Sequence, residues 1–271
     1  MSLLAERLLL GDYSDSLKAF APPELQLIRD GIEQAHLFKV DNVARYLWGN
    51  KGKRDYEAGD FPEVRPPFPC ALFEYAMPMD LFPPIPRGTP HIERVADLLV
   101  ENKGTVFLWR FIQQENDIAL LPARLMYDVE RLAEWKWWGR EGVRKIFGVG
   151  TLAPTLFTLS LLSCKNVVLT EHATPPKLIK KRVRRGDVPS IRWTTLEIGP
   201  ITTALDRAVT EGAATDIKHA LHVCRGHFKT FDRKPLFGRV KGRFWWTPHV
   251  RGSAEEGVVF KDYNVTRTEL E

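Results

Sequence analysis

Four of the seven histidines of this chain fall within the 31 residues from His219 to His249, among several arginines and lysines. Two of them, His222 and His227, flank Arg225. One imidazole can accept a proton from a 2′-hydroxyl group while a second group protonates the leaving oxygen, and a cation can stabilise the charge on phosphorus. The residue types therefore suit a metal-independent ribonuclease. Histidines in β-rich segments more often bridge strands as structural hydrogen-bond donors, so we assign no catalytic residue.

The same segment contains residues that can bind a metal ion, namely His222, Cys224, His227 and His249. On an extended strand His222 and Cys224 share one face, whereas His227 points to the other. No Cys-x-x-Cys or His-x-x-x-His pair supports them. The sequence also lacks a glycine-rich phosphate loop, a Gly-x-Ser-x-Gly motif and a His-Glu-x-x-His motif. We therefore expect neither a metal nor a cofactor.

Basic charge is concentrated in two segments of the C-terminal half. Residues 177–185 contain six lysines and arginines and no acidic residue, and residues 218–251 contain nine against the single acid Asp232. Because the net charge of the whole chain is +5, the remaining residues carry −9. Aromatic side chains are interleaved with the cations of the second segment, which is how single-stranded nucleic acid is commonly held, by base stacking and phosphate pairing.

We predict that the cations of both segments bind the phosphates of RNA, free or in the ribosome. The alternative is that both segments are solvated surfaces or pair with acidic residues of the protein itself, and that the aromatic residues are core. The predicted nucleic-acid-binding residues are Lys180, Lys181, Arg182, Arg184, Arg185, Arg225, Lys229, Arg239, Lys241 and Arg243.

The composition indicates a globular protein. With 271 residues, of which 44% are hydrophobic, the chain can form one large domain or two smaller ones. Three cysteines at irregular spacings argue against a secreted disulfide framework. The longest apolar stretch, Leu152 to Cys164, is shorter than the roughly 20 residues that a bilayer crossing needs. Since the first residues also lack the features of a signal peptide, we expect a cytoplasmic protein without a membrane partner.

The hydrophobic pattern of the N-terminal half predicts helices and antiparallel strands. Apolar residues at three- and four-residue steps predict an amphipathic helix over residues 22–49, and the run CALFEYAM predicts a buried strand from Cys70. The segment 95–127 is divided by ENKG and QEND, which is typical of an antiparallel meander. These elements would form a four-stranded sheet covered by the early helix.

The remaining pattern predicts helices followed by a β-rich tail. Residues 129–148 are predicted to be helical, with some indole surface of their three tryptophans exposed, and residues 152–164 are predicted to form a buried helix. A short strand within residues 166–176 and an alternating strand after Gly186 follow. We expect helix and loop over residues 201–222 and a terminal hairpin.

The predicted fold class is therefore α+β, with an N-terminal helix packed on an antiparallel sheet, central helices and a β-rich basic C-terminal part. We expect two functional halves. Residues 1–150 would be an α+β half that binds a partner protein or peptide, and residues 151–271 would be the basic half.

Two C-terminal stretches resemble a widespread family of phage, prophage and mobile-element proteins. Their pattern is a basic run ending Arg-x-Gly-x-x-Pro, an alternating strand, and then Arg-Gly-His-aromatic and Trp-x-Pro-x-Val. The segment PPFPCALFEY is similar to the proline, strand and glutamate element in the N-terminal half of that family. The matching residues of the C-terminal motifs are Arg185, Gly186, Pro189, Trp193, Arg225, Gly226, His227, Phe228, Trp246, Pro248 and Val250.

One branch of that family is the anti-CRISPR protein that suppresses production of the type V-A effector nuclease. It is understood to recognise the N-terminal peptide of the effector during translation, which leads to loss of the transcript. The resemblance implies a non-catalytic phage regulator in the cytoplasm of a bacterial host, with a target protein or nascent peptide and RNA or the ribosome as partners. Cys224 stands where many relatives in the family have arginine. The pair Trp245-Trp246 and the longer hairpin after Phe228 differ from the anti-CRISPR branch, so its particular target does not carry over.

The resemblance also changes the interpretation of the histidine segment. Arg225, Gly226, His227 and Phe228 are interpreted as a unit that fixes a turn at the root of a basic hairpin. The ribonuclease, with His222 and His227 as acid and base and Arg225 stabilising charge, is the second hypothesis. A third is a protein-only inhibitor that covers a nucleic-acid-binding enzyme with its acidic surface.

Overall fold

The chain divides into two units, which are described separately. The first comprises Met1–Ser163 and Val167–Glu197, and the second Cys164–Asn166 and Ile198–Glu271. The predicted division at residue 150 into functional halves stays a prediction. The computed structural model describes residues 4–13, 20–49, 61–77, 91–129, 131–139, 149–185, 191–198, 220–224, 227–236, 238–246, 249–251 and 253–258.

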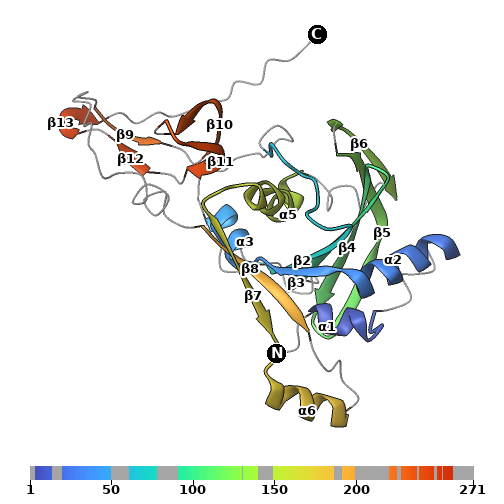
Figure 1. Ribbon diagram of the computed structural model, residues 1–271. Helices are drawn as coiled ribbons and strands as arrows, with labels where there is room; N and C mark the ends of the chain where they lie inside the picture. The colour runs from blue at the N-terminus through green and yellow to red at the C-terminus, as the bar shows by residue number, and fades with distance from the viewer. Residues whose placement is uncertain are drawn as a thin grey trace. The chain divides into compact units, whose positions relative to one another are not determined.

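A large, mostly antiparallel sheet forms the first unit together with a few helices, so the fold is mixed α+β. Its strand order is β6-β5-β4-β3-β2-β1-β8-β7 (Figure 1). All neighbouring pairs from β2 to β6 are antiparallel, and β1 pairs in parallel with β2 and β8. The strands are β1 His36–Lys39, β2 Cys70–Ala76, β3 Arg94–Asn102, β4 Thr105–Gln114, β5 Asp117–Asp128, β6 Arg131–Gly139, β7 Val167–Ala173 and β8 Arg192–Ile198.

Helices cover both faces of this sheet. The described helices of the first unit are α1 Leu4–Leu9, α2 Pro22–Gln34, α3 Asp41–Gly49, α5 Val149–Leu162 and α6 Pro176–Arg185. The first two pack on β2 and β3, and their apolar residues share one core with Leu72, Leu98 and Trp109. The other face, with Tyr75, Asp97 and Arg110, meets α5, which lies within the curve of the sheet (Figure 1). Two-sided burial explains why β2, β3 and β4 are almost continuously apolar.

The prediction of one helix over residues 22–49 was wrong. The helix α2 ends at Gln34, and Ala35 has extended backbone angles. Residues His36–Lys39 then form β1, in which Leu37 and Phe38 are buried, before Asp41 begins α3. The segment forms a strand in spite of its helical periodicity because it lies between β2 and β8. There, strand pairing satisfies its backbone hydrogen-bonding groups, and burial of its apolar side chains stabilises the strand.

The predicted helix over residues 129–148 was also wrong in its described part, and the four-stranded sheet was too small. Residues Arg131–Gly139 form β6, whose Trp137 and Trp138 lie opposite Leu125 and Arg124 of β5. Three tryptophans that do not fit one face of a helix are accommodated by a strand, because alternate side chains point to opposite faces. The exposed indole surface was predicted correctly, since 43% of Trp138 is exposed.

Other predicted elements are confirmed. The strand from Cys70, the meander of β3, β4 and β5, the strands β7 and β8 and the buried helix α5 are all present. The residues of α5 from Leu152 to Leu161 are buried. None of the helices in the described residues has both the length and the apolar character that a membrane span requires. The segment 201–222, predicted as helix and loop, lies outside the described residues except for its last three.

The second unit consists of short strands. Strands β10 His227–Leu236 and β11 Val240–Trp246 form an antiparallel hairpin, as predicted for the tail. Strand β9 Ala220–Cys224 lies between β12 His249–Arg251 and β13 Ser253–Val258 in a separate three-stranded sheet.

A buried ion pair connects three strands of the first unit to α5. Asp97 and Arg110, 0% and 2% exposed, form a bidentate pair, with the Arg110 Nε and Nη2 donating to the two carboxylate oxygens at 2.6 and 2.8 Å. The Tyr75 hydroxyl donates to Asp97 at 3.2 Å and accepts from Arg110 at 3.0 Å. From α5, the Thr155 hydroxyl donates to Asp97 at 2.6 Å and the Thr151 carbonyl accepts from Arg110 at 3.1 Å.

A second buried carboxylate holds α1 against the opposite face of the sheet. Glu74, which is 1% exposed, accepts hydrogen bonds from the backbone N–H groups of Leu4 at 3.2 Å and Ala5 at 3.0 Å. The Arg94 Nε donates to the same carboxylate at 2.8 Å, and Arg94 also pairs with Asp41 at 3.2 Å. Glu74 is the glutamate of the proline, strand and glutamate element, and it acts here as the cap of a helix N-terminus.

Replacing Arg110→Met should strongly destabilise the first unit, because it leaves the Asp97 carboxylate buried without its counter-ion. We expect a loss of about 3–5 kcal/mol in the free energy of unfolding, measured by urea denaturation monitored by circular dichroism. The double variant Asp97→Leu, Arg110→Met removes both charges and should recover much of that loss. A single variant within about 1 kcal/mol of the original protein would show that the pair is not a structural constraint.

Candidate nucleic-acid interface

The hairpin of β10 and β11 carries both aromatic and basic residues on each of its two faces. Residues directly opposite one another in an antiparallel pair lie on the same face. The register pairs His227 with Trp246, Lys229 with Phe244 and Phe231 with Gly242. We call this set of residues the aromatic face: His227, Lys229, Phe231, Gly242, Phe244 and Trp246.

The rings of the aromatic face contact one another around a lysine. The Lys229 ammonium lies 5.0 Å from the ring centroid of Phe231 and 5.5 Å from that of Trp246. The imidazole of His227 is stacked near the Trp246 indole, with 6.4 Å between centroids. Phe244 is buried at the base of the cluster, whereas His227 and Lys229 are exposed and Phe231 and Trp246 are half-buried. The face therefore presents ring surface and positive charge to solvent together.

The outer edge of β11 is held by residues that are distant in sequence. The side chain of Asn166 donates to the Trp245 carbonyl at 2.8 Å and accepts from the Trp245 N–H at 3.0 Å. The Lys165 N–H donates to the Arg243 carbonyl at 2.8 Å. Trp245 is buried and packs against Phe228, with 4.7 Å between centroids. Residues 164–166 thus act as an additional strand-like support for β11.

Lys165 is a cation that sequence reasoning missed. Its side chain runs over Gly242, where an added Cβ would come within 3.1 Å of the lysine Cγ and 3.2 Å of its Cε. Gly242 also has φ +130°, which favours glycine. The absence of a side chain at Gly242 therefore admits a second lysine stem at the aromatic face. The only sequence signal was an isolated lysine after the apolar helix.

The predicted nucleic-acid-binding residues are distributed over four places, apart from Arg225, which lies outside the described residues. Lys229 lies on the aromatic face, whereas Lys241 and Arg243 alternate onto the opposite face, where the Arg243 Nε donates to the Thr230 hydroxyl at 3.4 Å. Arg239 is exposed in the turn between the strands. The other predicted cations belong to α6 of the first unit and are Lys180, Lys181, Arg182, Arg184 and Arg185.

The cations of α6 form a stripe along the helix. At 100° per residue, Lys177, Lys180, Lys181, Arg184 and Arg185 fall at i, i+3, i+4, i+7 and i+8, on one side. Within the part of the chain that the structure describes, these five form no ion pair. Arg182 lies off this stripe, and its guanidinium pairs with Glu6 of α1 at 2.6 Å.

The residues proposed for catalysis or metal binding are placed only in part. The backbone register sets His222 of β9 opposite Arg251 and Cys224 opposite His249 of β12. His227 lies in β10, and Arg225 lies outside the described residues. Among the described residues, no three His, Cys, Asp or Glu side chains form a group that could hold a metal ion. The structure therefore gives no geometry for an acid and base pair.

Some of the motif residues are located and others are not. Trp193 of β8 stacks on His172 of β7, with 5.4 Å between centroids, so it packs the pair of strands next to α6. Phe228, His227 and Trp246 lie in the hairpin. Arg185 ends α6 and Val250 lies in β12 opposite Val223. The remaining motif residues Gly186, Pro189, Arg225, Gly226 and Pro248 lie outside the described residues.

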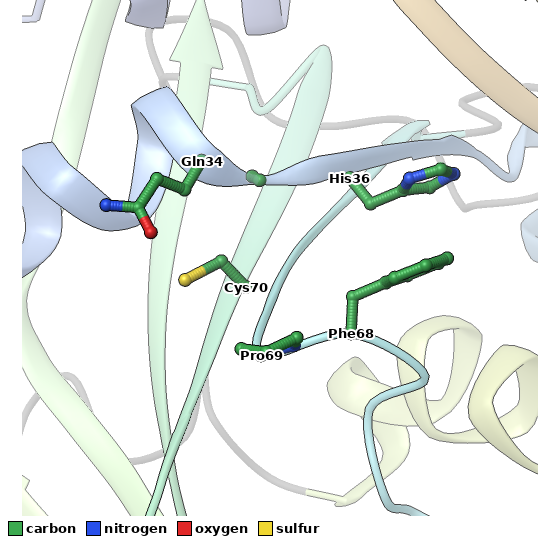
Figure 2. Close-up of a pocket in the computed structure, with 6 residues that line it drawn as sticks. Gln34, His36, Phe68, Pro69 and Cys70 are labelled. Atoms are coloured by element: carbon green, nitrogen blue, oxygen red, sulfur yellow. The ribbon is translucent and has the colours of Figure 1, made fainter.

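A small pocket of about 240 Å³ in the first unit was not predicted (Figure 2). Gln34, Ala35, His36, Phe68, Pro69 and Cys70 line it. The rings of His36 and Phe68 stack with 4.1 Å between centroids, and His36 Nε2 hydrogen-bonds to the Thr194 hydroxyl at 3.1 Å. Burial, and then the negative charge of Asp30, raises the pKa of the Cys70 thiol. A raised pKa disfavours the thiolate, so it does not favour nucleophilic chemistry at Cys70.

Comparisons of the chain with protein families, with curated proteins and with solved structures find no match. The resemblance to phage and mobile-element proteins stays an expectation. The aromatic face is accordingly the candidate site that rests most directly on side-chain geometry.

Removing the Asn166 side chain should loosen β11. Asn166→Ala leaves the Trp245 N–H and carbonyl without their side-chain partners, at a cost of about 2 kcal/mol. We expect amide hydrogen exchange in β11 to become about 30-fold faster, measured by mass spectrometry. Asn42→Ala, which removes an amide bonded to the Leu196 carbonyl in the first unit, is the matched control and should leave β11 unchanged. Equal exchange in both variants would contradict this anchoring role.

Proposed function

We propose that this protein is a phage-type regulator that binds single-stranded RNA through the aromatic face of its C-terminal hairpin. The observation that carries the proposal is the placement of Lys229 between Phe231 and Trp246, with His227 stacked beside them. An aromatic surface next to a cation suits an unpaired base and its phosphate, because every base has a stacking face and every nucleotide carries a negative charge.

A nucleotide base can displace the Lys229 ammonium group from the rings of the aromatic face. An exposed cation–π contact contributes only about 0.5–1 kcal/mol, whereas stacking of a base on an aromatic side chain contributes about 1–3 kcal/mol. Lys229 can therefore move off the rings toward a phosphate at little cost. Lys165 supplies a second long cation near Gly242.

The regulatory part of the proposal is supported by the sequence resemblance. The protein would act in the cytoplasm of a bacterial host, where it would bind a target polypeptide, nascent or complete, through its first unit. RNA or the ribosome would be engaged by the second unit. The two activities together would lower expression of the target, in the way understood for the type V-A anti-CRISPR branch that the C-terminal motifs resemble.

RNA binding should depend on one face of the hairpin. We expect Lys229→Ala to weaken the binding of a short fluorescent oligouridine by about tenfold, measured by anisotropy at low and at physiological salt. The matched control is Lys241→Ala, which removes the same charge from the opposite face and should cost about twofold. Trp246→Leu keeps an apolar residue and should lose the stacking contribution of about 1–3 kcal/mol.

The same assay separates the competing functions. Equal effects of Lys229→Ala and Lys241→Ala, or no salt-sensitive binding at all, would overturn the proposed interface. Cleavage of the RNA in EDTA that stops in His227→Ala would replace it with the ribonuclease. A protein partner retained after nuclease treatment, without oligouridine binding, would favour the protein-only inhibitor.

A further inference from the structure

The strand β7 is an exposed edge of the large sheet. It is the last strand of the order, next to β8, and within the described residues no strand pairs with its outer side. Val168 and Leu169 are 54% and 50% exposed, which is unusual for apolar residues in the strands of this sheet. Residues 168–171 are all exposed, so both faces of the strand are open as well as its edge.

This edge lacks the features that normally prevent edge pairing. Proteins protect edge strands with lysine, proline, bulges or short length. The sequence of β7, VVLTEHA, has no lysine or proline, and Glu171 is its one carboxylate. His172 is turned toward the sheet, since its Nε2 hydrogen-bonds to the Thr195 hydroxyl at 2.8 Å. An unprotected apolar edge of this length is expected to receive another strand.

One hydrogen bond shows which backbone N–H groups of β7 point to its open edge. The Thr174 N–H donates to the Ile191 carbonyl at 3.1 Å, toward the β8 side. N–H groups alternate between the two edges of a strand, and Leu169 lies an odd number of residues before Thr174. The N–H of Leu169 therefore points away from β8, into the open edge.

A basic helix stands at the end of the same strand. The helix α6 begins at Pro176, three residues after β7 ends, and lies beyond the C-terminal end of that strand (Figure 1). Its stripe of Lys177, Lys180, Lys181, Arg184 and Arg185 spans about 12 Å along the helix axis. The ion pair of Arg182 with Glu6 holds the helix to α1 and leaves the stripe without a described counter-ion.

We infer that β7 and α6 together form a docking site for an extended, carboxylate-rich segment of a partner polypeptide. The segment would add a strand to the edge of β7, with apolar side chains on Val168 and Leu169 and carboxylates near the stripe of α6. A polypeptide fits better than RNA here, because only a peptide backbone can continue the hydrogen-bond ladder of a strand. The inference rests on the part of the proposed function that assigns polypeptide binding to the first unit.

The test uses short labelled peptides and the full-length protein. A peptide of alternating Glu and Val should bind at least about tenfold more tightly than one of alternating Lys and Val, and its affinity should fall with salt. Leu169→Pro removes the outward N–H and should weaken binding by about tenfold or more, whereas Leu169→Ala keeps that N–H and should cost less. Leu169→Glu, which places a carboxylate on the edge that repels those of the peptide, is the second blocking variant.

The outcomes separate this inference from RNA binding. Leu169→Pro and Leu169→Glu should bind oligouridine as the original protein does, whereas Lys229→Ala should keep peptide binding. The inference is overturned if the Glu–Val peptide does not bind at about 1 mM, or if the two blocking variants of Leu169 bind it as tightly as the original protein does. It is also overturned if Lys180→Glu with Lys181→Glu weakens oligouridine binding and leaves peptide binding intact, since α6 would then be an RNA surface.

Discussion

Asp97 and Arg110 face each other in the interior of the first unit, where neither side chain has meaningful contact with water. Removing each charge from water costs several kcal/mol, so the pair is tolerated only because every partner is in place. Burial alone would favour loss of the Arg110 proton, but the adjacent Asp97 carboxylate outweighs it and raises the pKa of Arg110. For Tyr75, burial itself raises the pKa, which keeps its phenol as a neutral donor.

The need to satisfy every hydrogen bond of the buried Asp97–Arg110 pair determines how the layers of the first unit fit together. Tyr75, Asp97 and Arg110 come from three neighbouring strands, and their remaining bonds are completed by Thr151 and Thr155 of α5. The helix must therefore cover this face in one position, because a shift along the sheet would leave a buried charge unsatisfied. Glu74 places α1 on the opposite face by a similar constraint, with Arg94 as its counter-ion. The edge strand β7 receives no such cover among the described residues.

The second unit uses a different kind of support. The outer edge of its hairpin is anchored by the amide of Asn166, which bonds both backbone groups of Trp245. With that edge fixed, the residues of the aromatic face can present rings and charges to solvent. Gly242 completes the arrangement, because a side chain there would displace the stem of Lys165. Buried and half-buried aromatic residues thus occur on the same two strands, and Phe244 and Trp245 are the buried ones.

Periodicity alone determined most of the strands, the buried helix α5 and the terminal hairpin, because alternation and apolar runs are local properties of the chain. It did not determine β1 or β6, since the partners that convert Leu37, Phe38 and Trp137 into strand residues lie elsewhere in the sequence. Composition likewise located the basic and aromatic segments but not their faces. Only tertiary structure decided that Lys229 shares a face with Trp246 while Lys241 does not, that Lys165 joins them, and that β7 is an open edge. Strand register and sheet order depend on contacts between distant residues, which no local pattern contains.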